Sequence, residues 1–196
     1  MDTSQYSYPL RRVVGILGVA LPLLLIAGNG AVERSISFYY YTKMSTVFTG
    51  ILITFGLVLY TYTGGVAKTE QKVNENFMTT VGGIFALLVA LVPTRYGADI
   101  VAPYYVHNDS VRGWIHNGSA VLFIFLMGLV VLLKFSRDGH YRKFYLAFGT
   151  LVMIGLAFTI YSFVRPPFDH AVFWGESFCL WAFGIAWLRR GVRYNG

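Results

Sequence analysis

Six long apolar stretches, separated by short polar segments, dominate this chain of 196 residues. A stretch of about 20 apolar residues can cross the hydrocarbon core of a bilayer, roughly 30 Å thick, as an α-helix. The candidate spans are residues 13–32, 46–63, 78–93, 115–135, 144–164 and 172–188. The pattern therefore predicts an all-α polytopic membrane protein, a bundle of six transmembrane helices that forms one domain over residues 1–196.

The composition agrees with a membrane protein. Hydrophobic residues make up 56% of the chain and charged residues 13%, whereas an ordinary soluble domain carries about 25% charged residues. The first apolar stretch follows Arg11 and Arg12, as in a signal peptide, but it is longer than a typical signal segment and lacks a clear cleavage site. We therefore expect an uncleaved first span. Glycines within the spans, such as Gly83 and Gly184, are expected to allow close helix packing.

Lysine and arginine are distributed unevenly between the two sides of the predicted bundle. The termini and the second and fourth connections hold eleven of them: Arg11, Arg12, Lys68, Lys72, Lys134, Arg137, Arg142, Lys143, Arg189, Arg190 and Arg193. The other three connections hold five: Arg34, Lys43, Arg95, Arg112 and Arg165. This bias predicts that both termini are cytoplasmic. The net charge of +7 lies at the edges of apolar segments, so we expect membrane lipids as partners and no nucleic acid.

The side that is poor in lysine and arginine carries most of the other ionisable groups. These are Glu33, Asp99, His107, Asp109, His116, Asp169, His170 and Glu176. His116 and Glu176 fall at or inside predicted spans, where an ionisable side chain costs free energy unless it is paired or faces a wet cavity. These two residues are therefore the centre of the candidate site.

One interpretation is a metal or acid–base site built from His116, His170 and Glu176. Imidazole and carboxylate ligands suit zinc, and with Ser37 nearby the group predicts a membrane hydrolase whose catalytic candidates are Ser37, His116 and Glu176. However, the sequence contains no HExxH motif and no histidine pair at i, i+4 on one helix. The alternative is that His116 and Glu176 form hydrogen bonds between helices and that the protein holds no metal or other cofactor. We favour this alternative over metal binding.

Aromatic and hydroxyl residues occur in the same connections and helix ends as these candidate site residues. Aromatic residues at a membrane boundary usually form an interfacial belt, and the alternative is a rim that holds a ligand. The candidate ligand-binding residues are Ser35, Ser37, Tyr40, His116, Trp174 and Glu176.

Three segments carry a resemblance to known proteins. They are the run Ser35–Thr42 followed by Phe48-Thr49-Gly50, the sequence Val92-Pro93-Thr94, and the run Val172–Ser177 that leads into Trp181–Trp187. In these segments the chain resembles uncharacterised bacterial six-helix membrane proteins, distant relatives of the DRAM/Sfk group. The resemblance implies a multi-pass protein of the bacterial inner membrane and brings no established activity. The chain lacks the late HxxxH of ceramidase-like hydrolases, so it does not resemble that group.

The sequence favours a non-catalytic protein that binds a lipid headgroup or small amphiphile in an outward-facing polar pocket. The alternative is the lipid-directed hydrolase described above. A third alternative, a transporter or channel, requires polar residues through the middle of the bundle, where the spans offer mostly Thr, Tyr and Gly. The oligomeric state is left open and includes a homo-oligomer.

Overall fold

The computed structural model of the protein describes residues 4–62, 75–95, 108–137 and 141–192. The regular elements among these residues are all helices, namely α1 (Ser4–Asn29), η1 (Ile36–Tyr41), α2 (Ser45–Thr61), α3 (Glu75–Leu91), α4 (Asp109–Leu129), η2 (Val130–Lys134), η3 (Phe135–Arg137), α5 (Arg142–Val164) and α6 (Ala171–Arg190). Elements η1 and η3 are 3₁₀-helices, and η2 is a π-helical continuation of α4. The chain is therefore all-α, as predicted.

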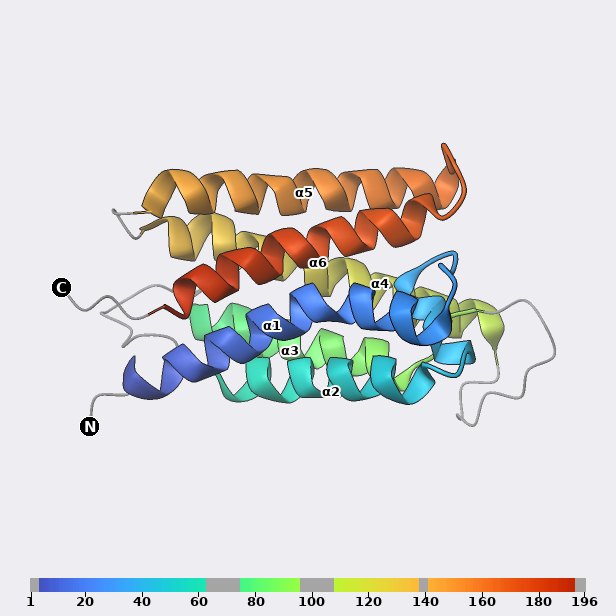
Figure 1. The fold of residues 1–196 in the computed structure, drawn as a ribbon, viewed down its shortest axis with the longest axis horizontal. Helices are drawn as coiled ribbons and strands as arrows, with labels where there is room; N and C mark the ends of the chain where they lie inside the picture. The colour runs from blue at the N-terminus through green and yellow to red at the C-terminus, as the bar shows by residue number, and fades with distance from the viewer. Residues whose placement is uncertain (1–3, 63–74, 96–107, 138–140, 193–196) are drawn as a thin grey trace.

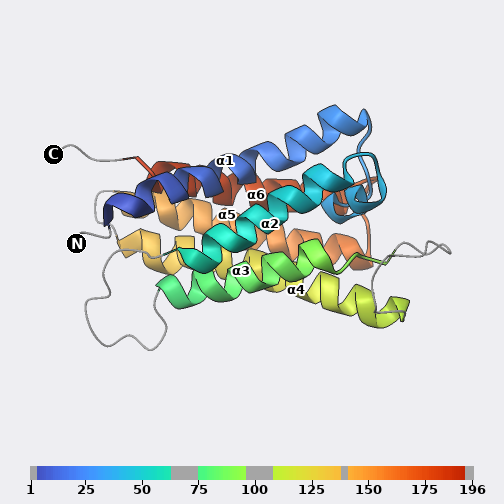
Figure 2. The ribbon, with the colours of Figure 1, turned by 90° about the horizontal axis from the view of Figure 1, so that it is seen from below.

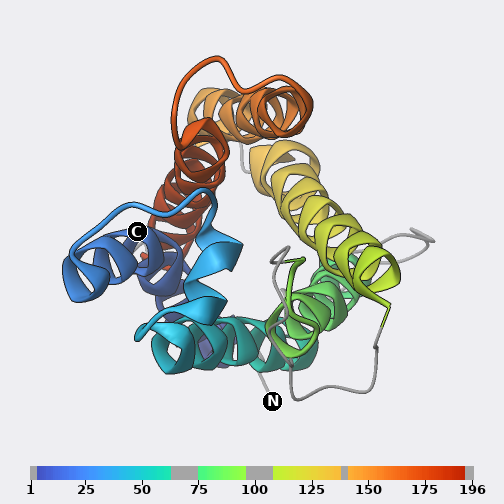
Figure 3. The same ribbon diagram turned by 90° about the vertical axis from the view of Figure 1, so that its right-hand side faces the viewer.

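The six α-helices run up and down along the long axis of the molecule (Figures 1 and 2). The start of α1 and the end of α6 lie together at one end, which we name the near end. Element η1 and the connection between α5 and α6 lie at the opposite end, which we name the far end. Viewed from the far end, the helices form a ring in the order α1, α6, α5, α4, α3, α2 (Figure 3), and each packs against its two ring neighbours.

Within the described ranges, four segments are long and apolar enough to cross a membrane: Ser7–Asn29, Asp109–Arg137, Arg142–Val164 and Ala171–Arg190. The helices Ser45–Thr61 and Glu75–Leu91 are apolar but shorter. Large apolar side chains also cover the outside of the bundle, for example Ile154 (58% exposed) and Phe163 (66% exposed). Apolar faces of this extent would be costly in water. These features are typical of a multi-pass membrane protein.

Helices α1 and α4 begin earlier than the sequence predicted. We expected the first span to start at residue 13, but α1 starts at Ser4 and carries Arg11 in a buried position. We expected the fourth span to start at residue 115, but α4 starts at Asp109. The Asn108 side chain accepts hydrogen bonds from the Ser110 and Val111 N–H groups at 3.0 and 3.2 Å, which is a standard N-cap. The third connection is correspondingly shorter than expected.

Aromatic rings fill the middle of the bundle. The Phe55 ring from α2 contacts those of Phe123 and Phe183, with centroids 5.9 and 6.0 Å apart. Toward the near end, the Trp187 ring contacts those of Phe183 and Tyr62 at 5.6 and 5.4 Å. Edge-on and tilted contacts of this kind add to the stabilisation from burying the rings. The interior of the ring of helices is therefore a packed aromatic core.

Glycine allows neighbouring helices to approach closely, as predicted. A Cβ atom at Gly83 of α3 would lie 2.6 Å from the Gly56 carbonyl oxygen of α2, and one at Gly184 of α6 would lie 2.9 Å from the Gly15 carbonyl oxygen of α1. Real Cβ atoms do not approach so closely, so both crossings depend on the missing side chain. Small residues serve this purpose in membrane bundles because lipid tails compete with larger apolar side chains.

Candidate functional site

Element η1 enters the far end of the bundle and brings polar groups into its interior. Ile36, Ser37 and Tyr39 are buried, although η1 belongs to the connection between two helices. The Tyr39 ring packs against the Phe173 ring of α6 at 6.0 Å between centroids, and the Tyr39 hydroxyl donates to the Ala31 carbonyl at 2.8 Å. The Tyr41 hydroxyl donates to the Thr94 carbonyl beyond α3 at 2.5 Å. Contacts to several neighbours thus fix the position of η1.

Ser37 and His116 form a hydrogen bond at this end of the bundle. Ser37 Oγ lies 2.7 Å from His116 Nε2, and His116 Nδ1 lies 2.6 Å from the Val92 carbonyl oxygen. A carbonyl only accepts hydrogen bonds, so Nδ1 carries the proton and the neutral ring presents a lone pair at Nε2. The Ser37 hydroxyl therefore donates to His116. The His116 side chain is fully buried, and its ring is held from both sides.

Glu176 of α6 accepts a hydrogen bond from the backbone of Ile36, the residue that precedes Ser37. Its Oε2 atom accepts a hydrogen bond from the Ile36 N–H group at 2.7 Å. Ile36 begins η1, and the cap residue Ser35 makes no side-chain capping hydrogen bond. A carboxylate at the first N–H of a helix satisfies a donor that has no partner within the helix. Glu176 therefore caps η1 from another part of the chain.

A cavity lies beside these polar groups. It has about 380 Å³ of empty space, including its open mouth. Its lining comprises Leu21, Ile36, Ser37, Phe48, Leu52, Val89, Ala120, Phe123, Ile124, Glu176 and Leu180. Ser37 and Glu176 are the polar members, and the remainder of the lining is apolar. The wall of the cavity is therefore almost entirely apolar, and Ser37 and Glu176 are the two polar residues along it.

The other predicted ligand-binding residues lie near this cavity but outside its lining. Ser35 is buried at the start of η1. The Tyr40 ring contacts those of Tyr41 and Phe48 at 5.3 and 6.5 Å. Trp174 is 40% exposed, on the outer surface of α6. Of the six predicted residues, the structure brings Ser37, His116 and Glu176 into one site.

The histidine and carboxylate groups proposed as metal ligands are not all together. His170 is exposed, and its Nδ1 atom lies 3.0 Å from the Glu33 carbonyl oxygen. Of the other ionisable groups on this side of the bundle, Asp109 pairs with Arg112 within α4, and Asp99 lies outside the described residues. In the described ranges, no three His, Cys, Asp or Glu side chains form a group that could hold a metal ion.

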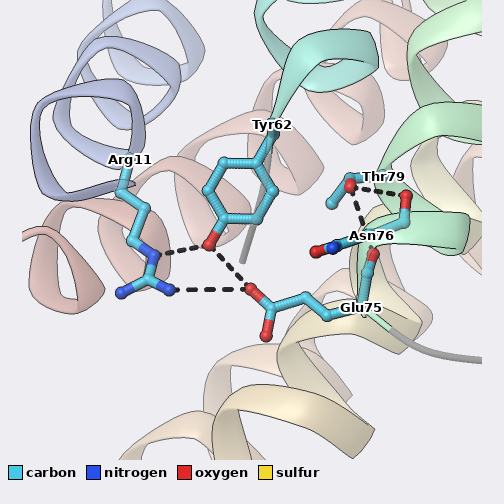
Figure 4. Close-up of polar contacts among 5 residues, drawn as sticks. All are labelled: Arg11, Tyr62, Glu75, Asn76 and Thr79. Atoms are coloured by element: carbon cyan, nitrogen blue, oxygen red, sulfur yellow. Dashed lines mark hydrogen bonds and ion pairs between the residues drawn. The ribbon is translucent and has the colours of Figure 1, made fainter. Parts of the chain in front are cut away.

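A second polar cluster, at the near end, was missed by the sequence analysis (Figure 4). Arg11 Nε donates to the Tyr62 hydroxyl at 2.6 Å, and this hydroxyl donates to Glu75 Oε1 at 2.7 Å. Arg11 Nη2 also lies 3.8 Å from Glu75 Oε1. The sequence analysis counted Arg11 only among the charges that set the orientation and assigned no role to Glu75. Instead, the two residues and Tyr62 connect α1, α2 and α3.

Helices of this length and apolarity, arranged in a closed ring with polar groups at both ends, define an all-α multi-pass membrane protein. The chain belongs to a family of unknown function, DUF7103, whose profile matches residues 18–190. No curated protein matches the chain. No solved structure matches it.

Proposed function

We propose that the protein binds a single-chain amphiphile in the far-end cavity, with the acyl chain against the apolar wall and the polar group beside Ser37 and Glu176. The observation that carries the proposal is the lining of this cavity, in which Ser37 and Glu176 are the two polar residues of an otherwise apolar wall. Ligand sites of this kind combine an apolar wall with a few polar groups that fix orientation.

The size of the cavity favours one chain over a whole phospholipid. Its empty space of about 380 Å³ includes the open mouth. The part of this space that water-sized groups can occupy is about 40 Å³. At about 10–15 Å³ each, it holds roughly three such groups, which is enough for one end of a chain. A two-chain lipid is several times larger. Phe123, which lines the cavity, contacts Phe55, and Phe55 contacts Phe183. Packed rings therefore adjoin the cavity, which favours binding over transport.

We also propose that all six α-helices cross the membrane, with both termini in the cytoplasm. Helices α2 and α3 have 17 residues each, which is at the lower end of the range of about 17–25 residues that span a bilayer. The excess of lysine and arginine at the near end supports this orientation. The resemblance to the DRAM/Sfk group supports the proposal that this membrane is the bacterial inner membrane.

Photo-crosslinking tests the binding site. The purified full-length protein in nanodiscs is incubated with a diazirine-bearing fatty acid, irradiated and digested, and the labelled peptides are identified by mass spectrometry. We expect labels on cavity-lining residues of α2, α4 and α6, because these helices provide most of the wall.

Two variants of α2 make the test specific. Leu52 lines the cavity and is 4% exposed, whereas Leu57 on the same helix is 53% exposed. Leu52→Trp should fill the cavity and reduce internal labelling at least fivefold, and Leu57→Trp should leave it unchanged. Equal labelling of both variants, or labels confined to the outer surface, would contradict the proposal.

A further inference from the structure

We propose that Ser37 is a nucleophile and His116 its general base, so that the cavity catalyses acyl transfer from an ester-linked single-chain amphiphile. This inference rests on the proposed function, because the bound amphiphile is the substrate. It adds a reaction, and it assigns roles to the two residues that the cavity and the hydrogen bonds bring together.

The direction of the hydrogen bonds is what a serine nucleophile requires. The Val92 carbonyl fixes the tautomer of His116, and the unprotonated Nε2 atom accepts from Ser37 Oγ at 2.7 Å. In serine hydrolases a third group orients the histidine in the same way, and the histidine takes the serine proton as the bond to substrate forms. Here a backbone carbonyl occupies the position of the orienting carboxylate.

The sequence explains why this carbonyl is free to accept. Helix α3 ends at Leu91, and the Val92 N–H group still donates to the Leu88 carbonyl at 2.9 Å. The last carbonyls of a helix have no partner within it. Pro93 and Thr94 follow without helical structure, so the Val92 carbonyl lies at the end of α3 and faces the His116 ring of α4.

The position of the pair also suits the reaction. His116 is fully buried and Ser37 is 6% exposed, so bulk water is largely kept from the pair. Ser37 is also one of the residues that line the cavity, so the proposal places the ester carbonyl at this part of the wall. Glu176 holds the adjacent Ile36 N–H group at 2.7 Å, which fixes the backbone that carries the nucleophile. A rigid support of this kind keeps reacting groups in a productive geometry.

The proposed reaction is balanced without a cofactor. Ser37 Oγ attacks the ester carbonyl carbon while His116 Nε2 takes the hydroxyl proton. The bond from this carbon to the alcohol oxygen breaks, and His116 returns the proton to the departing alcohol. Water then attacks the acyl-serine, with its proton passing through His116 to Ser37 Oγ. The products are a free carboxylic acid and an alcohol.

An alkyl fluorophosphonate, which reacts covalently with activated serines, tests the assignment. The full-length protein in nanodiscs is treated with a dodecyl fluorophosphonate, and the modified residue is located by peptide mass spectrometry. We expect labelling of Ser37, its loss in Ser37→Ala, and labelling at least about 100-fold slower in His116→Gln, since general-base catalysis contributes roughly 10²–10⁴-fold. Ser162→Ala, a buried serine of α5 outside the cavity lining, is the matched control and should label at the normal rate.

Folding is followed by thermal unfolding of each variant, and Ser37→Cys provides a second test. Its thiol should react with an alkylating reagent at a rate that falls when His116 is also changed to Gln. An unlabelled but folded protein, or equal rates with and without His116, would overturn the inference. If the fluorophosphonate does not label Ser37 but the diazirine fatty acid still labels the cavity, the proposed binding function is supported and the catalytic inference is rejected. If neither reagent labels the cavity, both proposals are rejected.

Discussion

At the scale of single residues, Arg11 illustrates how a charged side chain is accommodated between the helices. Its side chain is 7% exposed, and its Nε and Nη2 atoms face Tyr62 and Glu75. Its guanidinium carbon also lies 5.5 Å from the centre of the Tyr8 ring and 5.6 Å from that of Tyr62. A buried charge without a partner is very costly. The carboxylate, the hydroxyl and the two rings therefore act together to stabilise the guanidinium.

Glu75→Gln should destabilise the protein, because it removes the negative charge and leaves the Arg11 charge unbalanced. Breaking a buried pair by changing one partner costs about 3–5 kcal/mol, and we expect a loss near 3 kcal/mol because Glu75 is 18% exposed. The measurement is the unfolding transition of the detergent-solubilised protein, followed by the fluorescence of its tryptophans.

The double variant Arg11→Met with Glu75→Leu is the control for this prediction. Replacement of both members of a buried ion pair by apolar residues is often neutral or stabilising. It should therefore recover most of the stability lost in Glu75→Gln. A double variant less stable than Glu75→Gln would mean that the charge pair itself stabilises the near end.

At the scale of helices, the close contact between α2 and α3 depends on glycine. A Cβ atom at Gly83 would lie 2.6 Å from the Gly56 carbonyl oxygen and 2.7 Å from the Tyr60 nitrogen. Both are backbone atoms, which cannot move aside as a flexible side chain does. Gly83→Ala should therefore force α2 and α3 apart and destabilise the protein by about 1–3 kcal/mol, the usual cost of overpacking.

Gly50→Ala on α2 is the matched comparison. No atom lies within 4 Å of a Cβ at this position, and alanine favours a helix over glycine by up to about 1 kcal/mol. Gly50→Ala should leave the unfolding temperature unchanged or raise it slightly, whereas Gly83→Ala should lower it. Equal effects of the two substitutions would show that helix propensity, not close packing, governs both positions.

The helices could be predicted from hydropathy to within a few residues where an apolar run ends at exposed polar residues. Helix α5 was expected at residues 144–164 and is Arg142–Val164. The helices extend beyond the predicted spans where a polar residue is buried and paired, as Arg11 is in α1 and Arg112 is in α4. Hydropathy treats such a residue as the end of a span, because it carries no information about partners.

At the scale of the whole molecule, the sequence indicated the end of the bundle at which the candidate site lies but not its geometry. Alternate connections of an up-and-down bundle meet at the same end, so Ser37, His116 and Glu176 were expected together. The hydrogen bonds between these residues depend on how each helix is rotated about its axis and on the path of η1. The sequence determines neither of these. The Val92 carbonyl carries no side-chain signal, and the cavity wall is indistinguishable in sequence from ordinary core.

The orientation of the whole molecule gives the last prediction. The only cysteine, Cys179, is buried, so single cysteines can be introduced elsewhere and labelled with a membrane-impermeant maleimide. Lys43 and Asp169 are exposed at the far end, and Val192 is 44% exposed at the near end. If the near end is cytoplasmic, Lys43→Cys and Asp169→Cys should be labelled on intact bacterial cells, and Val192→Cys only after permeabilisation. Labelling of Val192→Cys on intact cells would reverse the orientation, and opposite results for Lys43→Cys and Asp169→Cys would contradict the six-span topology, since an even number of crossings separates these positions.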